Sequence, residues 1–336
     1  MRKPFALSKN FNLFFIASTL DANIPTWYNC SVPNWDKSTK VEFGKCILFM
    51  NEDIKKQNTS GSTLQDPTVI NSFFWKAGYK QDIGSRAEQQ DNVGIMLGSV
   101  RGKEVLLAVL ADGMGGMHDG AQFSRIVVDS HLRNFQSALN QYTRASTVLL
   151  SLALQANKDA NMIYDEDNPG GSTLVSVLFV GDYFYALSVG DSRISLFRKP
   201  EQRRGNKNRV VPLQINREHT LGGVLDERAW MGYISFEDAA GNIYRDSLTS
   251  SLGGPNIRRI DLTENPVRFL SGDRLVLMSD GIYRSVSEME MAEELEAPPA
   301  EATDKIVQRV LDKKIPEQDN LSIIVIEKQT TNTVIY

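Results

Sequence analysis

The stretch VLLAVLADGMGGMHDGA, residues 105–121, begins as an unbroken apolar run and ends in acids, glycines and a histidine. A short apolar run that is bounded by turn residues is typical of a buried strand. The run stops at Asp112, and Gly113 allows the backbone to turn sharply directly after it. We therefore expect a strand that delivers a carboxylate to a functional site. His118, one of only three histidines in the chain, lies in the same stretch.

The segments on either side of this stretch predict an α+β fold. Apolar runs joined by short turns are typical of antiparallel strands, and they cover 92–100, 104–111, 172–180, 183–190, 192–198, 209–215, 273–281 and 321–327. Helical patterns cover 121–139, 145–164, 287–296 and 302–314. Hairpins interleaved with helices predict stacked antiparallel sheets that are covered by helices.

Composition narrows the class of protein. The chain has 336 residues and a net charge of −4, with 41% hydrophobic and 23% charged residues, as in ordinary globular proteins. The negative balance argues against nucleic-acid binding through a broad basic face. Two cysteines, Cys30 and Cys46, are too few for a disulfide framework, which favours a reducing compartment. We expect a cytoplasmic protein with no membrane partner, because no run reaches the length of a transmembrane helix.

The N-terminus raises the question of a signal peptide. Residues 1–22 begin with basic residues, as a signal peptide does, but the apolar run is only LFFIASTL. A short buried strand or helix is the favoured interpretation.

Five aspartates stand at the ends of the expected strands. Asp112, Asp191 and Asp280 follow apolar runs, whereas Asp91 and Asp319 precede them. In an antiparallel sheet the end of one strand lies beside the start of another, so the five could gather along one edge. Each alone would suit a turn, but five together predict a site for cations that relieve their repulsion. Oxygen ligands without clustered His or Cys favour Mg²⁺ or Mn²⁺ over Zn²⁺.

Six motifs resemble those of one known family. The chain is similar to the PPM family, the metal-dependent serine/threonine protein phosphatases of type 2C, in their bacterial form. The motifs occur in the family's order and spacing and read DIGSRAEQQDN, LADGMGGMHDGAQFS, GGSTLVSVLF, SVGDSRISLFR, LVLMSDGIYRSVS and QDNLSIIVIE. The resemblance covers about residues 76–328 as the catalytic domain. It leaves residues 1–75 as an N-terminal accessory segment of unknown role, with a polar linker at 55–68, and residues 329–336 as a C-terminal tail.

The resemblance implies a four-layer α/β/β/α sandwich and a phosphatase that holds two Mg²⁺ or Mn²⁺ ions, with a third in a looser position. Asp112 would bridge the two metals, and Gly113 would give its carbonyl to one of them. Asp280 and Asp319 would complete the shell of the other metal. Asp91 would act close by, largely through metal-bound water.

The resemblance also implies the remaining roles. Arg86 would hold the substrate phosphate, since the planar guanidinium can meet two oxygens at once. Asp191 matches the acid that is associated with the third ion. A metal-bridging water would attack the phosphorus in line, without a covalent phosphoenzyme.

Two positions depart from the family's pattern. Gln90 stands where the family often has Glu, and it keeps an oxygen acceptor but loses a charge. We expect this change to weaken the binding of one metal ion and not to inactivate the enzyme. Met117 stands where the family usually has His, and His118 follows one place later. His118 fits two roles, a general acid at the site or a loop residue exposed to solvent, and both stay open.

Other polar positions have simpler interpretations. The basic run at 198–209 predicts a solvated hairpin loop, with attraction of acidic phosphopeptides as the alternative. His131 lies on the apolar face of an expected helix, which predicts a hydrogen-bonded, partly buried side chain. His219 falls where the family has a mobile flap, and a structural role is favoured over substrate contact. Met114 and Met117 are expected to pack and not to bind metal.

Three functions are compared. The first is a metal-dependent phosphatase acting on phosphoserine and phosphothreonine in phosphoproteins, opposing a bacterial serine/threonine kinase. The second is hydrolysis of small phosphoesters at the same metal centre. The third is a catalytically weak or inactive relative that acts as a phospho-binding or regulatory module. Gln90 and Met117 keep the third open, and the retained Asp112, Asp280 and Asp319 argue against it.

Overall fold

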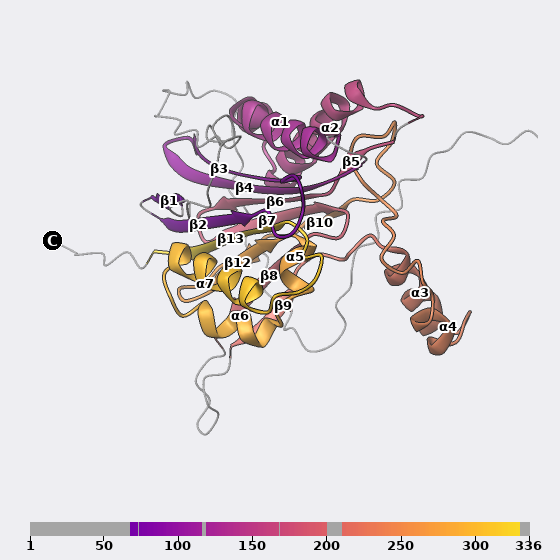
Figure 1. The fold of residues 1–336 in the computed structure, drawn as a ribbon. Coiled ribbons are helices and arrows are strands. Elements are labelled where there is room, and N and C mark those ends of the chain that lie inside the picture. Colours follow the sequence, from indigo (N-terminus) through magenta and orange to yellow (C-terminus); the bar gives the residue numbers. More distant parts are fainter. Residues whose placement is uncertain (1–67, 73, 116–118, 168, 200–209, 330–336) are drawn as a thin grey trace, which may run out of the picture. The chain divides into compact units, whose positions relative to one another are not determined.

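Two antiparallel sheets packed face to face, with helices on both outer faces, form the four layers of the fold (Figure 1). The computed structural model describes residues 68–72, 74–115, 119–167, 169–199 and 210–329. The predicted α+β sandwich is confirmed, and each strand and helix expected from residue 92 onward is present.

The seven-stranded sheet is built around two hairpins. Arg101 and Gly102 join β3 to β4 with φ values of 51° and 72°, the left-handed conformation that tight hairpin turns require. Gly181, with φ of 59°, begins the turn that joins β6 to β7. The strand order is β10-β7-β6-β4-β3, while β11 pairs with β7 and β5 with β4. The strands are β3 (Asp91–Val100), β4 (Lys103–Met114), β5 (Gly171–Ser172), β6 (Leu174–Val180), β7 (Tyr183–Val189), β10 (Asp261–Leu262) and β11 (Val267–Arg268).

The six-stranded sheet joins segments from both ends of the described chain. Its order is β1-β2-β13-β12-β8-β9. The strand β13 lies between β2 and β12, so a strand near residue 325 is hydrogen-bonded to one near residue 78. The strands are β1 (Thr68–Asn71), β2 (Trp75–Asp82), β8 (Arg193–Arg198), β9 (Val211–Gln214), β12 (Arg274–Met278) and β13 (Leu321–Lys328).

Helices cover the outer faces because their apolar stripes match the sheets. On α7, Ala302, Ile306 and Val310 recur every four residues and are buried against the six-stranded sheet. Helix α6 begins with a capping box between Ser287 and Glu290. On the other face, α1 and α2 pack on the seven-stranded sheet. The helices are α1 (Asp119–Gln141), α2 (Ala145–Ala160), η2 (Asn161–Ile163), α5 (Asp280–Tyr283), α6 (Glu288–Glu294) and α7 (Pro299–Asp312).

Two further helices extend to one side of the sandwich. Figure 1 shows α3 (Leu221–Trp230) and α4 (Phe236–Ala240) projecting away from both sheets, and we call residues 221–244 the arm. The helical patterns in the sequence do not include these two helices. Each helix is short, and Thr220 and Ser235 cap their N-termini through side-chain oxygens.

The sheet begins before residue 76, the start that the motifs suggested. Strand β1 pairs with β2 from Thr68 onward. Trp75 is fully buried between the sheets, and its ring lies 5.9 Å from that of Phe179. Ile70 and Trp75 are therefore part of the packed core.

Trp75→Ala is expected to lower the free energy of unfolding by about 3–5 kcal/mol, because it removes a large, fully buried side chain. Leu154→Ala, at a side chain that is about half exposed on α2, is the matched control and is expected to cost less than about 0.5 kcal/mol. Urea unfolding followed by circular dichroism measures both. A loss for Trp75→Ala as small as that of the control would place Trp75 outside the core.

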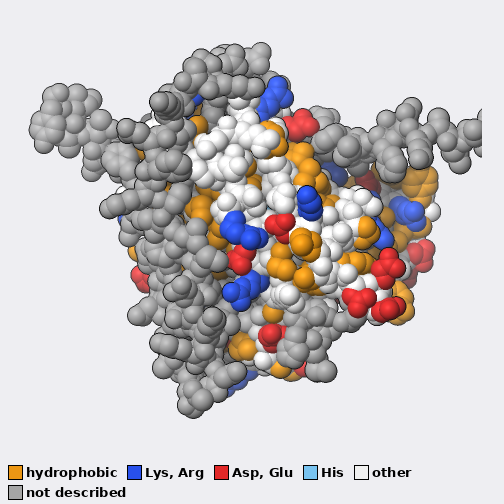
Figure 2. All heavy atoms as spheres, turned by 90° about the horizontal axis from the view of Figure 1, so that it is seen from above, with side chains coloured by type: hydrophobic (Ala, Val, Ile, Leu, Met, Phe, Trp, Pro, Cys, Tyr) orange, Lys and Arg blue, Asp and Glu red, His pale blue; other side chains and the backbone are white. Residues whose placement is uncertain are grey.

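Several expectations fall on residues outside the described ranges. These are the short element within 1–22, the linker up to residue 67, Met117 and His118, and residues 200–209 of the basic loop. Within the described ranges, no helix is both long and apolar enough to cross a bilayer. Viewed from the side of α1 and α2, acidic and basic side chains are interspersed over the described surface (Figure 2).

Candidate active site

Asp91 and Asp112 face each other across two neighbouring strands. They are directly opposite in the register of β3 and β4, and opposite residues project from the same side of a sheet. Asp91 is only 2% exposed, and its carboxylate accepts a hydrogen bond from the Ser279 hydroxyl at 2.8 Å. Two like charges are therefore held at the edge where β3 begins and β4 ends.

The backbone of Asp112 is fixed by a second motif. Its N–H donates to the Thr173 hydroxyl at 2.9 Å, and its carbonyl accepts from the Thr173 N–H at 2.8 Å. The Thr173 hydroxyl also lies 2.8 Å from that of Ser192, the residue after Asp191. These contacts tie the end of β4 to the loop that carries Asp191.

Asp280 and Asp319 reach the same edge from the other sheet. Asp280 opens the short helix α5 directly after β12, and Asp319 directly precedes β13. The backbones of Ser279 and Ser322 are hydrogen-bonded to each other at 3.0 Å, which holds the two segments side by side. Arg86 contacts Asp319 through one nitrogen, Nη2 to Oδ2 at 2.8 Å, and its side chain is 56% exposed.

The aspartates lie close enough for acidic neighbours to contribute to raised pKa values at Asp91, Asp112, Asp191 and Asp280. Burial raises the pKa of Asp91 to about 7, with repulsion from Asp280 and Asp319 adding to the effect. Burial, and then the other four aspartates, raise the pKa of Asp112 well above its ordinary value. Burial and Asp280 also raise the pKa of Asp191 to about 7. The predicted gathering of carboxylates on one edge is thus present in the structure.

The carboxylates do not converge on a single metal-binding position. Within the described residues, no three His, Cys, Asp or Glu side chains form a group that could hold a metal ion as they stand. Asp319 is paired with Arg86, Asp91 accepts from Ser279, and Asp280 faces Arg284. The donor set still fits a hard divalent cation, because it offers carboxylate oxygens whose mutual repulsion a cation would relieve.

Gly113, near the end of β4, lies in close contact with the first turn of α1. A side chain on Gly113 would place its Cβ 2.0 Å from the carbonyl oxygen of Gly120, in the first turn of α1. The Gly113 N–H donates to the carbonyl of Gln90 at 3.1 Å, and the Gln90 N–H donates to the Asn320 side chain at 2.8 Å. Gln90 therefore connects the end of β4 to the segment that carries Asp319.

His131 and His219 are buried and form hydrogen bonds with the backbone. Nδ1 of His131 lies 3.0 Å from the carbonyl of Val127, one turn earlier on α1, and the ring is fully buried, more deeply than expected. Nδ1 of His219 accepts the N–H of Gly190 at 3.2 Å. Gly190 precedes Asp191 and has φ of 100°, so His219 holds the backbone below that carboxylate. The structural interpretation of both residues agrees with these contacts.

Protonation of His131 should weaken the fold below neutral pH. Burial lowers the pKa of His131 to about 4 from 6.5, so between these values the unfolded chain binds the proton and the folded chain does not. Stability then falls as pH falls from 6.5 towards 4, by about 1.4 kcal/mol per pH unit. His131→Leu should flatten this slope, whatever its effect at pH 7. Urea unfolding at pH 7, 6 and 5 measures it, and parallel slopes for wild type and variant would refute the assignment.

Sequence reasoning missed three residues that organise the edge. Ser279 binds Asp91, Asn320 binds the backbones of Ile83 and Glu88 beside Arg86, and Arg284 contacts Asp191 and Asp280. One signal was available for Asn320. The tripeptide Gln-Asp-Asn occurs twice, at 90–92 and at 318–320, each time at the start of a strand that reaches the site.

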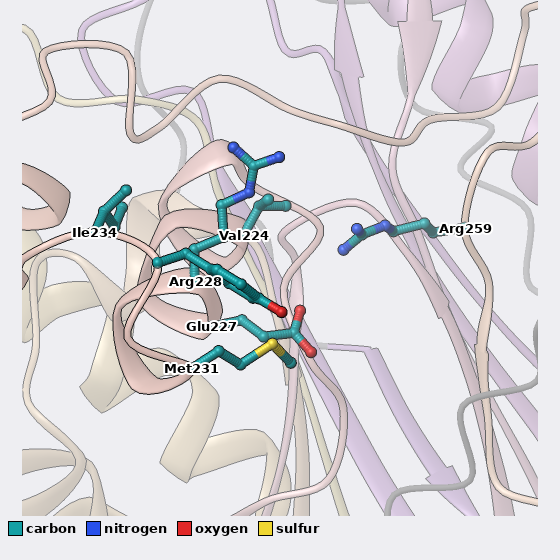
Figure 3. Close-up of a pocket in the computed structure, with 7 residues that line it drawn as sticks. Val224, Glu227, Arg228, Met231, Ile234 and Arg259 are labelled. Atoms are coloured by element: carbon teal, nitrogen blue, oxygen red, sulfur yellow. The ribbon is translucent and has the colours of Figure 1, made fainter.

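The arm carries a separate surface feature. An open depression of about 630 Å³ is lined by Val224, Glu227, Arg228, Met231, Tyr233, Ile234 and Arg259. Figure 3 shows Arg259 entering from a facing segment, while Glu227 projects from α3 and Met231 lies directly after that helix. None of these residues is one of the five aspartates or Arg86, so the depression is not part of the acidic edge. Large apolar side chains are also exposed along the arm: Trp230, Met231, Tyr233, Phe236, Ile243 and Tyr244.

Comparisons with known proteins agree on one family. The family model for protein phosphatase 2C matches residues 80–220. A protein phosphatase 2C-type protein of Streptococcus pyogenes serotype M6 is 30% identical over 223 residues, 64% of this chain and 82% of that protein. The serine/threonine phosphatase stp of Listeria monocytogenes serotype 4b is 27% identical over 261 residues, 75% of this chain and 92% of that protein. The crystal structure of the PstP catalytic domain with two manganese ions is 25% identical, with a TM-score of 0.57, over 76% of this chain and 99% of that one.

The chain therefore belongs to the protein phosphatase 2C family. It is an enzyme of the protein serine/threonine phosphatase class, a metal-dependent hydrolase.

Proposed function

We propose that this enzyme hydrolyses phosphoserine and phosphothreonine in phosphoproteins and opposes a serine/threonine kinase. The observation that carries the proposal is the gathering of five aspartates on one sheet edge beside the exposed Arg86. A phosphomonoester is a dianion, and it can approach such an acidic edge only where cations and arginines offset the charge.

The residues proposed to hold two Mn²⁺ or Mg²⁺ ions are Asp112 in the middle, with Gly113, Asp91, Asp280 and Asp319 around it. When bound, such ions lower the pKa of water so that it attacks phosphorus at neutral pH. Because the pKa values of Asp91 and Asp112 are raised, cation binding displaces their protons and should strengthen as pH rises through 7. Asp191 is a different case, because its carboxylate already faces an arginine.

Arg86 is proposed to orient the phosphoryl group. Its pairing with Asp319 uses one guanidinium nitrogen and leaves more than half of the side chain open to solvent. Asp319 and Asn320 hold the 83–88 turn in place, so the guanidinium is presented from a fixed backbone. His118 remains the predicted proton donor to the leaving alkoxide, as one of the two roles considered for it.

The fold supports a catalytic domain that begins before the first sequence motif. We place the catalytic domain at residues 68–328, with an accessory segment before it and a tail after it. Within this domain the motif residues come from both sheets, so neither half alone would form the site. The low cysteine count supports the cytoplasm as the location.

Hydrolysis of a phosphothreonine peptide and of p-nitrophenyl phosphate, each with Mn²⁺ and with EDTA, tests the proposal. We expect turnover of both substrates with Mn²⁺ and none with EDTA, and a higher kcat/KM for the peptide. Turnover of the small ester alone would favour the second hypothesis. Absence of turnover by folded, Mn²⁺-bound protein would overturn the proposal in favour of a phospho-binding module.

A further inference from the structure

The five aspartates of the acidic edge do not share the same surroundings. Asp112 is surrounded by the other four acids, which raise its pKa. At the far end, Asp191 and Asp280 face Arg284, and the positive charge of Arg284 acts on both of them, lowering their pKa values against the effect of burial. Arg284 therefore offsets part of the effect that burial and acidic neighbours have on Asp191 and Asp280.

Arg284 uses each of its three nitrogens on a different carboxylate. Nε lies 3.3 Å from Oδ2 of Asp280, Nη2 lies 3.7 Å from Oδ2 of Asp191, and Nη1 lies 3.6 Å from Oδ2 of Asp246. A bidentate pair would place two nitrogens on one partner. This guanidinium is instead shared by three segments: α5, the loop after β7, and the loop that follows the arm.

The backbone holds Arg284 in this position. Its N–H donates to the carbonyl of Asp280 at 3.0 Å, which closes the single turn of α5. The preceding residue, Tyr283, lies beneath the guanidinium of Arg193, 3.6 Å from the ring centre. Arg193 is in turn paired with Glu218. The backbone from which the Arg284 side chain extends is therefore held by this turn, next to a packed tyrosine.

Burial differs between the partners. The Asp191 and Asp280 side chains are 8% and 17% exposed, whereas that of Asp246 is 82% exposed. Two buried carboxylates require a nearby positive charge, while Asp246 is solvated without one. An arginine is always charged, so Arg284 offers a positive charge to both carboxylates at every pH at which the protein is folded.

We propose that Arg284 is a positioning residue that supplies this charge within the chain. Asp191 then holds no metal ion, the two cations lie among the other four aspartates of the edge, and Asp246 fastens the segment after the arm to it. The inference rests on the proposed metal-dependent function, and it replaces a cation at Asp191 by a guanidinium. Asp191 is thereby removed from the metal ligands that the family resemblance implied. The same arginine also connects Asp191 to the segment after the arm through Asp246.

Counting bound Mn²⁺ by equilibrium dialysis and metal analysis tests the inference without an activity readout. We expect two ions per chain in wild type, and still two in Asp191→Asn. Arg284→Gln should gain a third ion, and the double variant Arg284→Gln with Asp191→Asn should lose it again. Arg284→Lys keeps the charge and should return the count to two. Arg309→Gln, at a surface arginine paired with Glu293 and Glu294, is the matched control and should bind two.

A second readout follows the segment after the arm. Backbone amides of residues 244–249 should exchange hydrogen several-fold faster in Arg284→Gln than in wild type, because the contact with Asp246 is lost. The same amides should be unchanged in Arg309→Gln.

The possible ion counts distinguish a failure of this inference from a failure of the proposed metal-dependent phosphatase function. Three ions in wild type and two in Asp191→Asn would overturn the inference while leaving a metal-dependent phosphatase in place. A count of two in a folded Arg284→Gln protein would also overturn it. No bound Mn²⁺ in wild type would overturn both, and Asp112→Asn must lose at least one ion if the metals lie where we propose.

Discussion

Asp112→Asn is expected to reduce Mn²⁺-dependent kcat/KM on a phosphothreonine peptide by on the order of 10³-fold or more. Asp112 is the acid that the other four surround, so it is the position at which a cation would relieve the most repulsion. Asparagine keeps the shape and one oxygen, but it removes the charge that attracts the ion. The peptide assay with saturating Mn²⁺ measures the loss, and Asp280→Asn should behave in the same way.

The same substitution should not destabilise the metal-free protein. The pKa of Asp112 is raised in the folded state, so at pH 8 the ionised carboxylate favours the unfolded chain. Asp112→Asn removes this penalty, and we expect its melting temperature in EDTA to equal or exceed that of wild type. Mn²⁺ should raise the melting temperature of wild type by more than that of the variant.

Asp304→Asn provides the matched control. Asp304 lies on α7 and is paired with Lys80, away from the acidic edge. Its activity should stay within about twofold of wild type, since a partly exposed ion pair contributes little. Full activity in Asp112→Asn, or an equal loss in Asp304→Asn, would refute the central position given to Asp112.

Gly113→Ala should be among the most damaging single substitutions in the chain. Its Cβ would lie 2.0 Å from the carbonyl oxygen of Gly120 and 2.7 Å from that of Gln90. Neither neighbour is a side chain that can rotate away, so β4 and the first turn of α1 must separate. We expect a loss of more than about 4 kcal/mol in the free energy of unfolding, or failure to fold. Soluble yield and urea unfolding measure it.

Gly254→Ala is the control for this substitution. A Cβ on Gly254 meets nothing within 4 Å. We expect the stability of Gly254→Ala to stay within about 0.5 kcal/mol of wild type. If Gly113→Ala were as stable as this control, the end of β4 could move without cost, and the site would lack the rigid backbone described above.

Much of the site could be predicted because the fold brings together residues that share one sequence context. Asp91 and Asp112 each border a long apolar run, and antiparallel pairing of those runs places the two acids opposite each other. The same logic applies to Asp280 and Asp319, which border β12 and β13. Short apolar runs bounded by turn residues indicate these strands, and nearly every residue of β13 is buried.

Other parts depend on contacts that no local pattern encodes. Arg284 gains its role from residues 38, 93 and 4 positions away, and only the last separation is visible as a helical spacing. Helix α3 has Gly222 and Gly223 in its first turn, which lowers helix propensity, and α4 has only five residues. Strand β1 could not be recognised from its own four residues, and it is defined by its antiparallel pairing with β2. Tertiary pairing decides all three.

The position of β13 has a consequence for how the enzyme is made. During synthesis β13 emerges after every other described strand of the two sheets. Until then β2 lacks its partner, and the segment with Arg86 lacks Asp319 and Asn320. Nascent or prematurely terminated chains therefore carry no complete edge. We therefore expect no phosphatase activity from chains that end before β13.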